Sequence, residues 1–556
     1  MLITPSPPIA AANAMSESVL LHELVRAAAR FAVAAPALSF GARTMTYGQL
    51  DAAIASFAWG LVALGLSRAE RVGIYLEKRF EAVISSFGTA AAGGAFVPMN
   101  PLLKAEQVAF IARDCDVRVL ITSTERLALI APVLAQCSAL RHVVVTEAPA
   151  SSIPLPAGVE VTVWTRLLEA PLRPGHHVID SDMAAILYTS GSTGKPKGVV
   201  LSHRNMVVGA KSVASYLNND AHDTLLAALP LSFDAGFSQL TTAFHAGARV
   251  VLLNYLMPRD VLKTMVREKV TGITAVPPLY IQLAQLEWPA EIDRHLRYFA
   301  NTGGRMPLET LNRLRVQAPS AQPFLMYGLT EAFRSTYLPP EEVDRRPDSI
   351  GKAIPNAEIL VLREDGTECS SEEPGELVHR GPLVGLGYWN DGEKTAERYK
   401  PLPAGVGGRE PGLQLPEYAV YSGDTVRRDA EGFLYFVGRR DEMIKTSGYR
   451  VSPTEVEEIV YATRQVGECV AFGVDHATLG QVIQVIATAP PGTTALDIPA
   501  LLADCRNRMP TYMVPAGIAQ AQGPLPRNPN GKIDRKLLAT DWIERHAILE
   551  PPKDSP

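Results

Sequence analysis

Apolar and polar positions change their rhythm along the chain, and the first 330 residues carry an alternating pattern. Runs with helical spacing such as LHELVRAAARFA are followed by short apolar runs such as RVGIYL, AFVPMN and RVLITS. ARVVLLN and VTGITAVP continue this alternation further along the chain. Helical segments between short buried strands are typical of α/β layers. The pattern therefore predicts an α/β fold, with layered sheets in a large N-terminal domain.

The pattern changes after Ser349, where short strands and frequent turns follow one another. AEILVLREDG, GELVHRG and GFLYFVGR indicate a β-rich subdomain at about 349–440. We expect a disordered N-terminus at 1–18, a large domain at 19–440, and a small mobile α+β domain at 441–556.

A helix start is predicted inside this small domain, at SPTEVEEIV. Ser452 can act as the N-cap, and Pro453 stands at the first helical position. Glu455 can complete a capping box with Ser452.

Composition and charge narrow the class of protein. The 556 residues are 47% hydrophobic and carry a formal net charge of -5, so a large core is available and no basic surface for nucleic acid is indicated. No window approaches the roughly 18 to 20 apolar residues of a membrane span. The start MLITPSPPIAAANA lacks the basic region of a secretory signal, so we expect a cytoplasmic protein. Met15 is an alternative start.

The cysteines carry no metal or disulfide pattern. They are scattered, odd in number and never arranged as C-x-x-C. We expect buried small hydrophobic residues at all five positions, which are Cys115, Cys137, Cys369, Cys469 and Cys505.

The most polar loop of the α/β part is YTSGSTGKPKG at 188–198. AAILYT before it and VVL after it predict two strands, and SHRNMVVGAKSVASYL predicts a helix capped by Ser202. Glycines, hydroxyls and lysines in one loop can cradle a phosphate group. The loop is not a Walker A motif, since no Ser or Thr follows the lysine and a strand comes next. A solvated hairpin without a ligand is the alternative.

Six motifs in order resemble those of the AMP-forming adenylating superfamily, which contains acyl-CoA synthetases, peptide-synthetase adenylation domains and luciferases. Besides the loop, they are GGAFVPMNP at 93–101, YGLTEA at 327–332, YSGDTVRR at 421–428, GRRDEMIKTSGYRVSPTEVE at 438–457 and NPNGKIDRK at 528–536. The resemblance covers nearly the whole chain. It implies that ATP and Mg²⁺ convert a carboxylic acid to an acyl-adenylate, and that a thiol then takes the acyl group and releases AMP.

The resemblance also implies the nucleotide-binding residues. The loop, with Lys197 as the lysine of its PKG motif, would grip the β- and γ-phosphates. Tyr327 would lie against adenine, Thr330 on the α-phosphate and Glu331 on Mg²⁺. Asp424 would accept from both ribose hydroxyls with help from Arg439. The remaining loop positions implied are Thr189, Ser190, Gly191, Ser192, Thr193 and Gly194.

Two lysines of the C-terminal part are implied to act in turn. Lys532 resembles the catalytic lysine of adenylation, where an ammonium can stabilise developing charge. Asp441 matches the family's hinge, about which rotation would remove Lys532 and bring Lys445 and Gly448 to the site for thiol entry. Without the resemblance, a Gly-Lys pair near a C-terminus is read as solvated.

The acid pocket gives conflicting signals. In LPLSFDAGFSQL, Phe233 replaces the histidine that acyl-CoA synthetases carry, and Asp234 resembles the aspartate with which peptide-synthetase domains hold an α-ammonium. Arg334 either faces the pocket, favouring an acidic group on the substrate, or is a surface or ion-paired residue. The resemblance also implies Gly303 and Gly304 in this pocket. We expect an amino acid or another polar acid ahead of a plain fatty acid.

The acceptor and the competing classes stay open. The chain ends soon after Lys532, so we expect the thiol in trans, from CoA or a free-standing acyl carrier protein. The overall texture resembles bacterial acyl-CoA ligases associated with exosortase systems. A stand-alone amino-acid adenylating enzyme is the main alternative, and a non-catalytic nucleotide-binding protein is a remote one. A dinucleotide-binding oxidoreductase lacks its G-x-G-x-x-G signature here.

Overall fold

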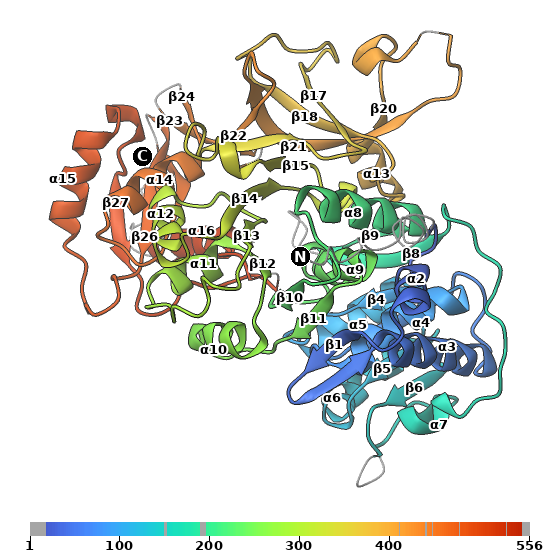
Figure 1. Cartoon of the computed structure of the whole chain (residues 1–556). Helices are drawn as coiled ribbons and strands as arrows, with labels where there is room; N and C mark the ends of the chain where they lie inside the picture. Colours follow the sequence, from blue (N-terminus) through green and yellow to red (C-terminus); the bar gives the residue numbers. More distant parts are fainter. Residues whose placement is uncertain are drawn as a thin grey trace, which may run out of the picture.

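Two large sheets and one small sheet, with helices between and around them, make up the molecule (Figure 1). The structure is a computed structural model that describes residues 18–148, 153–189, 196–410, 412–439, 442–446, 449–476, 479–529 and 531–547. The α/β fold class, with a large N-terminal part and a small α+β C-terminal part, is confirmed. The residue limits of the domains stay predictions.

The first sheet joins the α/β part to the β-rich part. Its strands run in the order β17 (Glu358–Leu362), β18 (Gly375–Arg380), β21 (Tyr418–Arg428), β22 (Leu434–Arg439), β16 (Ser349–Ala353), β15 (Thr336–Leu338), β14 (Gln322–Tyr327), β13 (Tyr298–Asn301), β12 (Gly272–Ala275), β10 (Thr224–Ala227), β11 (Arg249–Leu252), β1 (Pro36–Phe40) and β2 (Arg43–Thr46), and β20 (Tyr399–Pro401) pairs with β21. The pairs from β14 back to β1 are parallel, and those from β14 onward to β17 are antiparallel. The strand direction therefore changes between β14 and β15, shortly before the change in sequence texture at Ser349.

The second and third sheets belong to the N-terminal and C-terminal parts. The second contains β19 (Gly387–Tyr388), β9 (Lys197–Ser202), β8 (Met183–Thr189), β4 (Ala95–Pro98), β3 (Arg71–Tyr75), β5 (Val117–Thr122), β6 (His142–Val145) and β7 (Glu160–Val163) in spatial order. The third contains β24 (Tyr449–Val451), β23 (Ile444–Thr446), β26 (Gly480–Ala487) and β25 (Cys469–His476), with β27 (Gly517–Gln520) beside β26.

Helices cover the sheets and fill the space between them. They are α2 (Glu23–Phe31), α3 (Tyr47–Ala63), α4 (Phe80–Ala92), α5 (Ala105–Asp114), α6 (Thr124–Ile130), α7 (Trp164–Leu168), α8 (His203–Tyr216), α9 (Asp234–Ala246), α10 (Pro258–Glu268), α11 (Pro277–Ala284), α12 (Leu308–Gln317), α13 (Gly392–Arg398), α14 (Pro453–Ala462), α15 (Ile498–Arg508) and α16 (Arg535–Ala547). Short 3-10 turns include η2 (Thr330–Ala332).

Helix α9 lies in the core and has almost no exposed side, since all its residues from Asp234 to Phe244 are buried. Phe237 stacks on Phe96 at 4.8 Å between ring centres. A Cβ at Gly236 would lie 1.9 Å from the carbonyl oxygen of Pro230, so only glycine allows the start of α9 to pack on the preceding loop. This packing fixes the position of Asp234.

The two predicted helix starts have different outcomes. Ser202 Oγ accepts from the backbone N of Asn205 at 3.1 Å, so the predicted cap of α8 is confirmed. Ser452 occupies the N-cap position of α14, but its hydroxyl bonds to Thr454 Oγ1 at 2.7 Å and makes no cap bond. The capping box predicted there is wrong, because a nearer hydroxyl competes for the serine.

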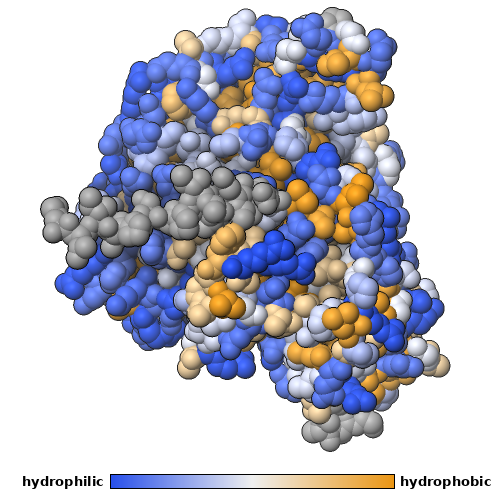
Figure 2. All heavy atoms as spheres, turned by 45° about the vertical axis from the view of Figure 1, so that its right-hand side comes forward, coloured by the Kyte–Doolittle hydropathy of each residue, from blue (hydrophilic) through white to orange (hydrophobic). Residues whose placement is uncertain are grey.

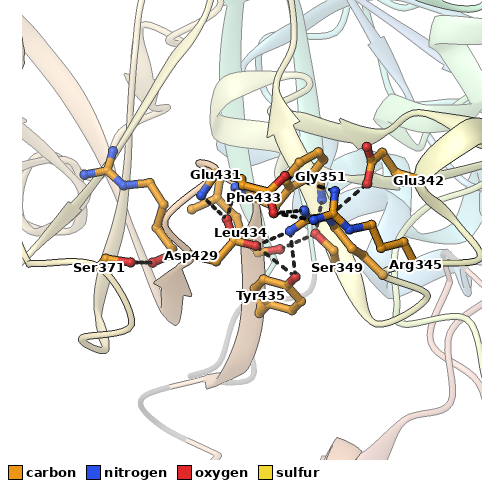
Figure 3. Close-up of polar contacts among 12 residues, drawn as sticks. Glu342, Arg345, Ser349, Gly351, Ser371, Asp429, Glu431, Phe433, Leu434 and Tyr435 are labelled. Carbon is orange, nitrogen blue, oxygen red and sulfur yellow. Dashed lines mark hydrogen bonds and ion pairs between the residues drawn. The ribbon is translucent and has the colours of Figure 1, made fainter.

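An arginine-centred cluster holds the β-rich hairpin against the rest of the first sheet. The Arg346 guanidinium is paired with Glu342 at 2.9 Å, and also with Asp429 and Glu431. It lies 4.0 Å from the centre of the Phe433 ring. Figure 3 shows these acidic and aromatic residues converging at the turn between β21 and β22. Charge networks with several partners hold geometry better than single surface pairs.

The small domain is docked on the large one. The backbone N of Leu308 donates to Glu458 Oε1 at 2.9 Å, and Arg464 pairs with Glu309 at 2.9 Å. On the other side of the contact, Asn100 Nδ2 donates to the carbonyl oxygen of Pro529. These contacts seat the C-terminal loop that carries Lys532 on the large domain.

The hydropathy of the surface and the burial of the cysteines agree with what the composition predicts. The face in Figure 2 is mostly hydrophilic, with separate hydrophobic groups. Across the described ranges, the structure has no helix that is long and apolar enough to cross a membrane. All five cysteines are free and buried, so the prediction of small buried residues is confirmed.

Candidate active site

The candidate site forms where parallel strands of the first sheet end. The pairs β10–β12, β12–β13 and β13–β14 are all parallel. The chain leaves β10 toward Asp234, leaves β13 toward Gly303, and leaves β14 through the YGLTEA turn. The carboxyl ends of parallel strands are where α/β sheets bind ligands. The topology thus brings three of the sequence motifs to one edge.

The hairpin β8–β9 is formed as predicted, with Thr189 opposite Lys197. Lys197 Nζ lies 5.5 Å from the centre of the Tyr388 ring, and Tyr388 lies on β19 beside β9. The Tyr388 hydroxyl donates to Glu331 Oε1 at 2.6 Å. One tyrosine therefore links the loop lysine to the carboxylate expected to bind Mg²⁺. Outside the described residues lie Ser190, Gly191, Ser192, Thr193 and Gly194.

The turn after β14 has strained backbone. Thr330 and Glu331 lie on η2, and Phe333 follows with φ 57° and ψ −42°, a region that bulky residues rarely adopt. The Phe333 ring is fully buried, and a Cβ at Gly209 of α8 would lie 2.4 Å from its Cδ1. The close packing of the Phe333 ring on Gly209 holds the turn that separates Glu331 from Arg334.

A largely buried carboxylate, with its side chain 13% exposed, lies at the β21–β22 hairpin. Asp424 and Arg439 are register partners, and Arg439 Nε lies 3.4 Å from Asp424 Oδ1. The Tyr327 hydroxyl donates to Asp424 Oδ2 at 2.5 Å. Burial raises the pKa of Asp424, while the Arg439 charge and the Tyr327 hydrogen bond act in the opposite direction. Asp424 Oδ1 accepts no hydrogen bond and is therefore available to a ligand hydroxyl.

Lys532 reaches the same cleft from the small domain. Its Nζ lies 5.7 Å from the centre of the Phe233 ring. Gly303 has φ 76°, and a Cβ there would lie 2.9 Å from Lys532 Cε, so glycine leaves the room for this side chain. Burial lowers the pKa of Lys532, while the carboxylates of Asp234 and Asp424 raise it. The ammonium thus lies near Phe233 of the acid segment, and the charges of Asp234 and Asp424 both act on its pKa.

The acid segment contains a buried ion pair. Arg334 Nη1 lies 3.7 Å from Asp234 Oδ2, and the two side chains are 3% and 4% exposed. Arg334 Nη1 also donates to Thr302 Oγ1 at 3.4 Å. Burial raises the pKa of Asp234, while the charges of Arg334 and Lys532 lower it. Arg334 was expected either to face the pocket or to be a surface or ion-paired residue. It is ion-paired with Asp234 and lies in the pocket region, so it has features of both alternatives.

The remaining candidate residues are placed as follows. Gly304 follows Gly303, and its carbonyl oxygen accepts from Asn301 Nδ2 at 2.8 Å. Lys445 is exposed on β23, so Lys532 and not Lys445 packs against the acid segment. The hinge candidate Asp441 and the thiol-channel candidate Gly448 lie outside the described residues.

Sequence reasoning missed three residues of this site. Tyr388 bonds Glu331, Thr302 bonds Arg334, and Phe333 holds the strained turn. A single tyrosine, threonine or phenylalanine has no signature in one sequence. Only the juxtaposition of distant segments gives these side chains a role.

Known proteins resemble the chain over nearly its whole length. It matches the AMP-binding enzyme family over residues 24–389, and the AMP-binding enzyme C-terminal domain over residues 455–532. The first match covers more than half of the chain. The chain therefore belongs to the AMP-binding enzyme family.

Three relatives show the range within this family. Gramicidin S synthase 2 of Aneurinibacillus migulanus is 27% identical over 91% of this chain, which spans only 11% of that protein. The L-proline--[L-prolyl-carrier protein] ligase of Streptomyces coelicolor is 29% identical, covering 91% of this chain and 94% of that one. A long-chain-fatty-acid--CoA ligase of Bacillus subtilis is 26% identical, covering 92% of each.

A solved structure supports the fold. The anthranilate CoA ligase AuaEII in complex with anthranoyl-AMP superposes with a TM-score of 0.84 at 24% identity, covering 96% of this chain and 99% of that one. At this identity the likeness concerns the fold alone.

Proposed function

We propose that the chain is an AMP-forming acid–thiol ligase. It activates a carboxylic acid with ATP and passes the acyl group to the thiol of CoA or of a carrier-protein phosphopantetheine. The observation that most supports this proposal is the position of Lys532. Its ammonium lies near Phe233 on the acid side, and the charge of Asp424 on the nucleotide side raises its pKa. The relatives named as acid–thiol ligases support the same reaction.

In the first step, a carboxylate oxygen of the acid attacks the α-phosphorus of ATP, and the bond to the β-phosphate breaks to release pyrophosphate. Lys532 lies where it can contact both charged groups and stabilise the charge that develops between them. Thr189, Lys197 and the loop between them hold the departing phosphates. Thr330 contacts the α-phosphate.

The nucleoside half is held by groups that are already in place. Tyr327 lies against adenine and fixes Asp424, which accepts from the ribose hydroxyls. The free acceptor at Asp424 Oδ1 fits this role. The Arg439 charge opposes the rise in the pKa of Asp424 that burial causes.

Mg²⁺ fits the site through Glu331. Magnesium in nucleotide sites uses one or two carboxylates, with phosphate oxygens and waters completing the shell. In the part of the chain that the structure describes, no group of three or more His, Cys, Asp and Glu side chains could hold a metal, so a nucleotide-borne cation is the better fit. When bound, the ion neutralises phosphate charge, and Tyr388 orients the carboxylate that meets it.

For the second step, the small domain rotates about Asp441. This motion takes Lys532 out of the cleft and brings Lys445 and Gly448 toward it, which opens a path for the thiol. The thiol sulfur attacks the acyl carbonyl, AMP leaves, and the thiol proton is released. Contacts between the domains include single hydrogen bonds, such as that from the backbone N of Leu308 to Glu458 Oε1, which such a rotation can break. We place this chemistry in the cytoplasm, where ATP and CoA are supplied.

A second candidate function is the activation of an amino acid for a carrier protein. Asp234 favours it, since a buried carboxylate can hold a substrate ammonium. In that case the ammonium has to displace Arg334 from the ion pair.

The reaction is tested by acid-dependent pyrophosphate release with ATP and Mg²⁺ over a panel of amino, dicarboxylic and fatty acids, with and without CoA. A selective signal that CoA accelerates supports a CoA ligase, and one that only a phosphopantetheinylated carrier accelerates supports a carrier-loading enzyme. Retained ATP binding with no release for any acid would contradict the proposal and favour a non-catalytic nucleotide-binding protein.

A further inference from the structure

A small cavity lies beside Arg334 of the buried ion pair, and its lining is partly polar and partly apolar. It lies between α8, α9 and the strands β10, β12, β13 and β14, and its polar lining includes Ser238, Gln239, Thr242, Thr274 and Arg334. About 10 Å³ is open to the centre of a water-sized sphere, which is room for about one water. Leu217, Leu225 and Met326 complete the lining with apolar groups, so the small volume, and not the polarity of the wall, excludes a long alkyl chain.

The cavity is also short. A Cβ at Gly272 on its wall would lie 2.4 Å from Cζ of the Tyr298 ring, so the tyrosine packs directly on the β12 backbone. The Tyr298 hydroxyl accepts from Asn219 Nδ2 at 3.2 Å, which fixes the ring in this position. The cavity therefore has room for one small group, such as a hydroxyl, and none for a longer substrate tail.

Both members of the ion pair have an unused hydrogen-bonding atom. Asp234 Oδ1 and Arg334 Nε are buried and have no hydrogen-bond partner. The separation of 3.7 Å between Arg334 Nη1 and Asp234 Oδ2 neutralises the charges without forming a hydrogen bond. Buried polar groups in native proteins are nearly always satisfied, so a free acceptor and a free donor on one pair indicate a ligand.

The chemistry of the ligand follows from what satisfies both atoms. An ammonium has only donors, so it can serve Asp234 but leaves the Arg334 N–H unsatisfied and adds a cation beside a permanent one. A second carboxylate can serve Arg334 but brings a negative charge to Asp234. A hydroxyl or a carboxamide donates to Asp234 and accepts from Arg334 while leaving the pair neutral.

We infer that the acid activated by this protein is a short carboxylic acid that carries an uncharged hydroxyl or carboxamide group, bound between Asp234 and Arg334. This inference rests on the proposed adenylation reaction. It assigns Asp234 and Arg334 together as one specificity site for a neutral group, in place of an ammonium site or an acidic-group site.

The test uses the full chain with ATP and Mg²⁺ in an acid-dependent ATP–pyrophosphate exchange assay. The acids are butanoic acid, its 2-, 3- and 4-hydroxy and 2-, 3- and 4-amino derivatives, succinic acid and succinamic acid. We expect one hydroxy acid or succinamic acid to exceed its amino, acidic and unsubstituted counterparts by at least about tenfold in kcat/KM, because sites built for a hydrogen bond reject analogues that lack it.

The variant Arg334→Gln sharpens the test. It removes the arginine paired with Asp234 and leaves Lys532 as the cation that acts on this carboxylate, so amino acids should gain at least about tenfold relative to hydroxy acids. The matched control is Asp234→Asn/Arg334→Gln, which removes both charges and keeps a neutral donor and acceptor. It should retain the preference for the uncharged group, and it is the reference if the single variant does not fold.

The possible outcomes distinguish the inferred substrate class from the proposed adenylation reaction. Exchange that is best with an amino acid, with succinic acid or with butanoic acid overturns the inferred substrate class and leaves adenylation standing. An unchanged preference in a folded Arg334→Gln variant also overturns it. No exchange with any acid, in a protein that still binds AMP by calorimetry, overturns the proposed function itself.

Discussion

The nucleotide side and the acid side of the cleft each contain a buried aspartate beside an arginine, yet the two are built differently. Asp424 accepts from Tyr327 at 2.5 Å and lies 3.4 Å from Arg439. Asp234 lies 3.7 Å from Arg334 with no hydrogen bond between the two side chains, and the Oδ1 atom of each aspartate has no hydrogen-bond partner. Under the proposed function, the Tyr327 hydroxyl fixes the aspartate on the nucleotide side in advance, whereas the acid side is completed by the particular substrate.

The largest effect is expected at the residue that serves both sides. Lys532→Ala should lower acid-dependent pyrophosphate exchange by about 10²–10³-fold, because it removes a charge that stabilises the transition state. Thioester formation from a supplied acyl-adenylate should be largely spared. Lys445→Ala is the matched control and should show the reverse pattern. An equal loss of both half-reactions in Lys532→Ala would refute the alternation of the two lysines.

The next effect distinguishes the two sides. Asp424→Asn should raise the KM for ATP by about 10- to 100-fold, since a charged hydrogen-bond acceptor is lost, and leave the KM for the acid nearly unchanged. Tyr327→Phe removes only the hydroxyl that fixes Asp424 and should cost less. Thr302→Val on the acid side should do the opposite, raising the KM for the acid and not that for ATP. If a single variant changed the KM for ATP and the KM for the acid by similar factors, the proposed difference between the two sides of the cleft would be contradicted.

A smaller effect is expected at Tyr388, which bonds the metal-site carboxylate. Tyr388→Phe should raise the Mg²⁺ concentration for half-maximal exchange by about tenfold, because residues that orient a metal ligand tune its affinity. Acid preference should not change. The measurement is a magnesium titration at saturating ATP and acid, with thermal unfolding as the control for folding. A change in acid preference would show that the two sides are not independent.

The smallest effect is a pH shift. Burial lowers the pKa of Lys532, so its ammonium loses the proton at a lower pH than a free lysine does. The kcat/KM for adenylation should therefore decline on the alkaline side before the ordinary lysine range is reached. Lys532→Arg keeps the charge, so its alkaline limb should move to higher pH even if its rate is lower. If kcat/KM declined at the same alkaline pH in the original protein and in Lys532→Arg, the titrating group would not be Lys532.

The strands and contacts around Asp424 could be predicted from the sequence more easily than those around Asp234. The α/β pattern, the hairpin at Thr189 and Lys197, and the change of texture at Ser349 all depend on local spacing. Asp424 and Arg439 belong to separate motifs, which the register of β21 and β22 joins. The Asp234–Arg334 pair spans 100 positions and depends on the side-chain geometry at the ends of two strands, which no periodicity encodes. The hydrogen bond between Ser452 and Thr454, which replaces the predicted cap bond, could not be predicted from the sequence either.

The contact between Phe333 and Gly209 has a consequence for how this sequence can diverge. The ring occupies the space that any side chain at 209 would need, and the ring also keeps the turn in its strained conformation. Gain of a methyl group at 209 therefore has to be accompanied by loss of bulk at 333. We expect the two positions to drift as a pair, so that their joint substitution in a homologue marks a lineage whose acid pocket has been remodelled.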